Sequence, residues 1–117
     1  MARPVAAHDL LPERALDGDP DAIGMLVDEV YVALQAEDPA LIETLAAYLE
    51  RTGSLEGAAR ELFVHPNTVR YRLKKVIEVI DWDPGVPRDA LTLHLAIVLG
   101  AMSEPNQLPG AATGATL

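Results

Sequence analysis

Apolar residues recur every three or four positions along most of the chain, the periodicity of helices that bury one face. The first such stripe follows Asp19-Pro20 and reaches about residue 35, and a second follows Asp38-Pro39 and stops at Gly53. Asp accepts hydrogen bonds from the free amides of a helix start, and Pro fits the first turn because its missing N–H has no partner there. The pattern therefore predicts two amphipathic helices, one over 19–35 and one ending just before Gly53.

Three further helices are predicted downstream. Ser54 is placed to cap a short third helix, His65-Pro66 opens a fourth, and a fifth begins near Pro87. The apolar positions of these helices are, in order, Leu55, Ala58, Ala59 and Leu62, then Val69, Leu73, Val76 and Ile80, then Leu91, Leu95, Val98 and Leu99. The expected fold is all-α, a domain of about five helices that contains a helix-turn-helix.

The length of 117 residues is enough for one domain with a modest core. Residues 1–18 are expected to be a mostly irregular leader, in which residues 10–16 can form a short turn that packs. Residues 19–101 form the helical domain. From residue 105 the chain consists largely of Pro, Gly, Ala and Thr, so residues 102–117 are expected to be a disordered tail.

Composition excludes several classes of protein. The chain has no cysteine, so a disulfide framework, a zinc-thiolate site and a thiol nucleophile are all impossible. No apolar run approaches the ~20 residues that span a bilayer, and the first residues lack the apolar core of a signal peptide. We therefore expect a soluble, cytoplasmic protein with no membrane partner.

The charge of the chain is unevenly distributed. The formal net charge is -9, but residues 1–50 hold eleven acids and only two bases. Residues 51–88 hold seven bases and five acids. DNA binding depends on the local field at the contact surface, which salt screens over ~8 Å. The gathering of positive charge in one segment keeps DNA binding open despite the acidic total.

That segment also carries the pattern of a helix-turn-helix at about residues 54–80. The first of its helices is short, and Ala58 and Ala59 allow the next helix to approach closely. The three-residue connection Phe63-Val64-His65 favours a steep crossing of the two helices. The second helix, at 66–78, is then expected to enter the major groove.

A helical wheel separates two faces of this second helix. Its four apolar residues share one side, and amide, hydroxyl, phenol, guanidinium and ammonium groups lie around the other. Because the leading turn of a recognition helix sits deepest in the groove, the candidates for reading bases are Asn67, Thr68, Arg70 and Tyr71. The candidates for binding phosphates are Ser54, His65, Arg72, Lys74 and Lys75.

The stretch from His65 to Leu73, His-Pro-Asn-Thr-Val-Arg-Tyr-Arg-Leu, resembles the C-terminal helix-turn-helix of the PucR family of bacterial transcriptional regulators. The likeness extends over about residues 38–101. The upstream Leu11-Pro12-Glu13-Arg14-Ala15-Leu16 and the turn before Asn67 look closest to an actinobacterial branch that controls fatty-acid and mycolic-acid biosynthesis genes. The resemblance implies binding to double-stranded DNA, homodimers, and an acyl-CoA effector that acts through regions outside this chain.

Two other functions stay open. The same helices would also suit a protein-interaction or oligomerisation domain, or a domain that senses acyl ligands in its apolar interior. The three histidines are too far apart in sequence for a metal site, and no catalytic constellation stands out. We therefore expect no enzyme activity, no cofactor and no metal.

Overall fold

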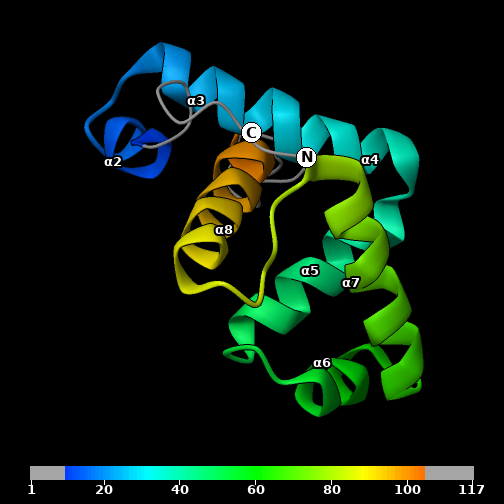
Figure 1. The fold of residues 1–117 in the computed structure, drawn as a ribbon. Coiled ribbons are helices and arrows are strands. Elements are labelled where there is room, and N and C mark those ends of the chain that lie inside the picture. The colour runs from blue at the N-terminus through cyan, green and yellow to red at the C-terminus, as the bar shows by residue number, and fades with distance from the viewer. Residues whose placement is uncertain (1–9, 105–117) are drawn as a thin grey trace, which may run out of the picture.

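The computed structural model describes residues 10–104, which form helices joined by short turns and contain no strand. Figure 1 shows one long rod along one side of the molecule, with α8 packed beneath it and α5, α6 and α7 grouped at the other end. The predictions of an all-α fold and of five helices are confirmed. The elements are α2 (Leu11–Leu16), α3 (Pro20–Leu26), η1 (Val27–Val32), α4 (Ala33–Glu37), α5 (Pro39–Glu50), α6 (Leu55–Leu62), α7 (Pro66–Ile80) and α8 (Pro87–Met102).

The helix starts follow from the capping residues. A carboxylate oxygen of Asp19 accepts from the N–H of Asp21 at 2.9 Å at the start of α3. The side chains of Asp38 and Ser54 cap α5 and α6 in the same way. All three caps predicted from the sequence are confirmed. Each fixes where a helix begins, because it satisfies amides that have no partner within the helix.

The predicted first helix is a single rod built from α3, η1 and α4, and its middle turn is π-helical. Its fully buried residues are Ala22, Leu26, Val30 and Leu34, spaced four apart. In an α-helix each four-residue step overshoots one turn by about 40°, so three steps would carry the last residue off the face. A π-helical turn contains more residues, which corrects this drift and keeps all four residues on the core.

The leader is not irregular throughout. Residues 11–16 form α2, and Leu11 at its start is fully buried. The Arg88 guanidinium of α8 donates to both carboxylate oxygens of Glu13 at 2.7 and 2.8 Å. These hydrogen bonds lower the pKa of Glu13 to about 2, so the pair ties α2 to α8 at neutral pH and weakens as pH falls below the usual range of a glutamate. Residues 1–9 and residues 105–117 of the predicted tail lie outside the described residues, but residue 102, the first of that tail, is the last residue of α8, so the helix extends further than expected.

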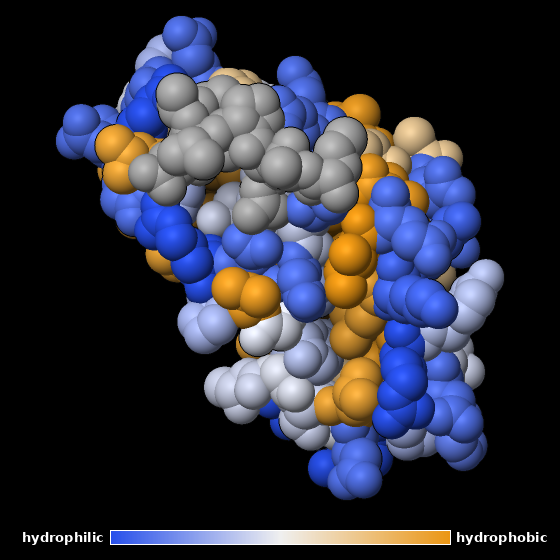
Figure 2. Space-filling view, in the orientation of Figure 1, coloured by the Kyte–Doolittle hydropathy of each residue, from blue (hydrophilic) through white to orange (hydrophobic). Residues whose placement is uncertain are grey.

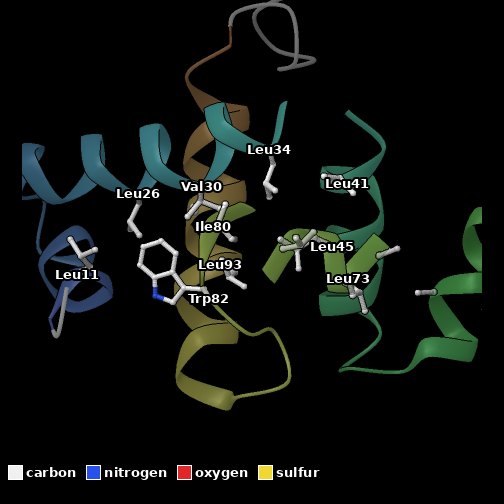
Figure 3. Packing of buried hydrophobic residues seen from close by; sticks show 14 of the residues in the cluster. Leu11, Leu26, Val30, Leu34, Leu41, Leu45, Leu73, Ile80, Trp82 and Leu93 are labelled. Carbon is white, nitrogen blue, oxygen red and sulfur yellow. The ribbon is translucent and has the colours of Figure 1, made fainter. Parts of the chain in front are cut away.

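Trp82 lies in the centre of the core, where the chain leaves α7. Only 4% of its surface is exposed, so its side chain holds this turn against the core. Figure 3 shows its indole ring directed toward Leu11 and Leu26, with Val30 and Leu93 nearby. Trp82 therefore joins α2, the rod and α8 behind the recognition helix.

The buried face of α8 is not made of the apolar residues singled out from the sequence. Its buried residues are Thr92, Leu93, Ala96 and Gly100, whereas Leu91 and Val98 are about half exposed. α8 is apolar on nearly all sides, so periodicity alone does not show which side packs. The packed side is the one that carries Gly100, because this residue has no side chain and lies directly against the ring of Tyr31 in η1.

Gly100→Ala tests this close approach. A Cβ built at Gly100 would lie 2.1 Å from Tyr31 Cγ and 2.6 Å from Tyr31 Cβ, so the rod or α8 must shift. We expect a loss of about 1–3 kcal/mol in the free energy of unfolding, measured by urea denaturation.

Gly24→Ala is the matched control. No atom lies within 4 Å of a Cβ at Gly24, so this change should stabilise α3 by about 0.5–1 kcal/mol. A stabilising Gly100→Ala would contradict the packing described for α8.

Candidate nucleic-acid interface

The turn between α6 and α7 depends on one left-handed residue. Phe63, the C-cap of α6, has φ 59° and ψ 43°. This conformation lets the Val64 N–H donate to the Ala59 carbonyl at 3.0 Å and directs the Val64 side chain against the core. The chain thereby changes direction within three residues, and α7 leaves α6 at once as the helix-turn-helix pattern predicts.

His65 caps the start of α7. Its Nδ1 accepts from the Asn67 N–H at 2.9 Å, and Pro66 occupies the first position of the helix. The sequence placed His65 at the opening of this helix and among the phosphate candidates, and the structure shows that its side chain is the cap. The imidazole is exposed, so its other nitrogen faces solvent at the front of the helix. Ser54 is likewise engaged as the cap of α6, accepting from the Gly57 N–H at 2.9 Å.

The two faces predicted for α7 are present. Its buried residues are Val69, Leu73, Val76 and Ile80, the four assigned to the inner face. Asn67, Arg70, Tyr71 and Lys74 are exposed on the outside, and Thr68, Arg72 and Lys75 are half-buried at the edges. Figure 2 shows hydrophobic surface running as a band in the region of α5 and α7, with hydrophilic side chains on both sides.

Two of the predicted base-reading residues lie together at the front of α7. The Arg70 guanidinium donates to the Oδ1 of Asn67, one helical turn earlier. This hydrogen bond holds two groups that suit the edges of guanine and adenine in a shared orientation. Tyr71 lies beside them with 69% of its surface exposed.

Arg72 is turned back toward the domain. Its Nη1 donates to the hydroxyl of Thr44 in α5 at 3.2 Å, and Thr44 is fully buried. Sequence reasoning missed Thr44. The sequence did contain a signal for it, since Thr44 is a hydroxyl residue among the apolar positions of the second predicted helix. The hydrogen bond fixes the guanidinium at the edge of α7, beside the outward face.

The two lysines of α7 have different surroundings. The Lys75 ammonium lies 3.7 Å from a carboxylate oxygen of Glu37 in α4 and 4.0 Å from one of Glu78. Lys74 makes no ion pair with any other described residue and is exposed. Sequence reasoning also missed Glu37, because only the fold brings the end of the rod beside the middle of α7. Of the two ammonium groups, Lys74 is the one presented to solvent without a counter-charge.

Other site chemistries lack residues in this part of the chain. Within residues 10–104, no group of three His, Asp or Glu side chains is placed to hold a metal ion. None of the helices in that range is both long and apolar enough to cross a membrane. The outward face of α7 gathers the polar groups described above, and the α6–turn–α7 geometry is that of a DNA-binding helix-turn-helix domain.

Comparison with known families agrees with this class. Residues 41–99 match the PucR C-terminal helix-turn-helix domain, and the chain belongs to this family. It is a DNA-binding domain of a PucR-family transcriptional regulator, and the family is not enzymatic. The resemblance stated from the sequence is confirmed at this level.

Several relatives extend the match. Uncharacterized proteins of Mycobacterium tuberculosis and Mycobacterium bovis are 52% identical over 103 residues, which cover 88% of this chain and 25% of theirs. The purine catabolism regulatory protein of Bacillus subtilis is 40% identical over 63 residues, 54% of this chain and 12% of that protein. A solved structure, a regulator of polyketide synthase expression from Bifidobacterium adolescentis, shares 47% identity with a TM-score of 0.80 over 88% of this chain and 43% of its own. The chain thus spans about a quarter of the length of its mycobacterial relatives.

The Glu37–Lys75 pair leads to a prediction. Lys75 must leave Glu37 before it can bind a phosphate, so Glu37→Gln should raise DNA affinity about two- to fivefold at low salt. This range corresponds to the strength of an exposed ion pair. The measurement is fluorescence anisotropy of the chain with a labelled duplex.

Glu43→Gln is the matched control, since Glu43 is an exposed acid of α5 that lies in no ion pair with the described residues. It removes the same charge without touching Lys75 and should change the affinity less. The effect of Glu37→Gln should also disappear in a Lys75→Ala background. Equal gains from both glutamine variants would attribute the effect to net charge and not to the pair.

Proposed function

We propose that this domain reads the sequence of double-stranded DNA by placing α7 in the major groove, and that the genes it controls belong to fatty-acid and lipid biosynthesis. The observation that carries the first part is the division of α7 into two faces. Its inner face is buried along the whole helix, while its front presents the joined Asn67 and Arg70 side chains. An interaction domain or an acyl-ligand sensor would not require this polar arrangement at the start of one helix.

The residues divide into two roles. Amide and guanidinium groups form paired hydrogen bonds with base edges, and ammonium groups bind phosphate oxygens without regard to sequence. We assign base reading to Asn67, Thr68, Arg70 and Tyr71. We assign phosphate binding to Ser54, His65, Arg72, Lys74 and Lys75, with His65 acting through its uncapped nitrogen and Ser54 through the helix start that it caps.

The assignment to lipid genes rests on two kinds of likeness. The sequence resembles an actinobacterial branch of regulators of fatty-acid and mycolic-acid genes. One relative of known structure is a regulator of polyketide synthase expression, and polyketides and fatty acids are both built from acyl units. An acyl-CoA effector is the corresponding signal, and it would act through regions outside this chain.

We further propose that the domain works as a homodimer. Two recognition helices would then enter successive major grooves with half-sites ~34 Å apart. The exposed side of α8 supports this, because it presents the apolar residues Leu91, Val98 and Met102. Residues 90–103 carry no charged side chain, so two acidic copies can approach along this face with little repulsion.

The first test is fluorescence anisotropy with three duplexes at several salt concentrations. They are the promoter beside the protein's own gene, a fatty-acid-synthesis promoter, and a scrambled sequence. We expect selective binding that falls steeply with salt, because bound phosphates release counterions. Failure of both the chain and a covalently linked dimer to bind at low salt would instead favour an interaction domain. Selective binding to the first promoter alone would reject the lipid-gene assignment and keep the reading of DNA.

Arg70→Ala and Lys74→Ala distinguish the two roles. Arg70→Ala should cost about 1–3 kcal/mol on the preferred sequence and relax the preference at one base position. Lys74→Ala should weaken binding to every sequence alike and reduce the salt slope by about one. Binding of each variant to a panel of single-base changes measures both effects. A changed base preference in Lys74→Ala would show that the roles are assigned wrongly.

A further inference from the structure

Phe63 combines two unfavourable features. It is the only phenylalanine in the chain, and 93% of its surface is exposed. Its backbone is left-handed, with φ 59°, a conformation that is rare for a bulky residue and that favours glycine or asparagine. Strain at an exposed apolar residue points toward a functional role for the side chain.

The fold itself does not need a phenyl ring at this position. The Phe63 N–H donates to the Arg60 carbonyl at 3.3 Å, and the next N–H, that of Val64, donates to Ala59 at 3.0 Å. These main-chain bonds end α6 and form equally well with glycine or asparagine at position 63. The ring also lies outside the hydrophobic core and the residues packed against it.

The position of Phe63 indicates what the ring contacts. It lies three residues before Pro66, the first residue of α7, at the tip of the turn. In a helix-turn-helix the first helix crosses the DNA backbone while the start of the second enters the major groove. The tip between them therefore faces the wall of the groove, where the apolar surfaces are the C–H face of deoxyribose and the 5-methyl group of thymine.

We propose that Phe63 is an apolar DNA contact, packing its ring against the wall of the major groove beside the bases read by α7. The inference rests on the proposed binding of α7 in that groove. It adds a contact that carries no charge and no hydrogen bond to the polar contacts of α7. The strained backbone is then the conformation that directs the ring away from the core and toward the DNA.

The test is Phe63→Asn, measured against a duplex that the wild-type chain itself selects from a random pool. Asn is well tolerated in the left-handed conformation, so the thermal midpoint should stay equal or rise. DNA affinity should fall about fivefold or more, within the discrimination typical of a good base contact. The salt slope should not change, because no phosphate contact is lost. Phe63→Tyr keeps the ring and should retain the affinity.

Leu16→Asn is the control, since Leu16 is a second exposed apolar residue, on α2 at the opposite end of the molecule from α6 (Figure 1). It should leave DNA affinity unchanged. A duplex with deoxyuridine for thymine identifies the surface that the ring meets. If the ring packs on the thymine methyl, the wild-type chain should lose as much affinity on this duplex as Phe63→Asn loses on the normal duplex, and Phe63→Asn should lose no more. If the ring packs on deoxyribose, the wild-type affinity should be the same on both duplexes.

If the wild-type chain binds its selected duplex and Phe63→Asn binds it with the same affinity, this inference is overturned and the proposed function stands. A wild-type chain that binds no duplex would overturn both. A loss of affinity that comes with a lower thermal midpoint or a changed salt slope would also count against an apolar contact, because either result points to disturbed α7 side chains.

Discussion

The packing of α7 on α5 is the interaction on which the rest of the domain depends. Val69 and Val76 are fully buried on one side of this seam, and Leu45 is fully buried on the other. Burying one such side chain contributes about 1.5–3 kcal/mol, so the seam holds α7 without help from its polar residues. The exposed polar residues of α7, such as Asn67, Arg70 and Lys74, are therefore not needed to hold the helix in place. The small Ala58 and Ala59 of α6 complete the arrangement, because they let the supporting helix lie close to α7.

Two of the positively charged side chains of α7 are engaged by other residues of the domain. Arg72 is held by Thr44, and Lys75 lies beside Glu37. The first fifty residues add eleven acids and only two bases, and the net charge of the chain is -9, which repels DNA. Phosphate contacts are common to all sequences, so such restraint lowers the affinity for every sequence by a similar factor and leaves the difference between sequences to base contacts. An acidic DNA-binding domain is thus physically consistent, because net charge acts mainly on the phosphate contacts that all sequences share.

Sequence patterns predicted those parts of the structure that local chemistry decides. Asp19, Asp38 and Ser54 cap their helices, and the inner stripe of α7 is buried as expected, because each signal lies within one or two turns of chain. Contacts between distant segments were not predictable. The packed side of α8 depends on Gly100 meeting Tyr31, and the surroundings of Lys75 depend on where the rod ends. The face that α7 turns outward was therefore predictable from sequence, but the partners that restrain its edges were not.

The π-helical turn of the rod constrains how this domain can change during evolution. The four-residue spacing from Ala22 to Leu34 fits the core only with the wider turn between Val27 and Val32. A π-helical turn holds about one residue more than an α-helical turn, so deleting one residue there would restore regular helix and leave α4 facing nearly the same way relative to α3. Deleting a residue from the α-helical part of the rod would instead rotate α4 by about 100°, and because α5 follows α4 directly and supports α7, the rotation would reach α7. Functional descendants of this sequence are thus expected to change the length of the rod only within Val27–Val32 and to vary elsewhere along it by substitution.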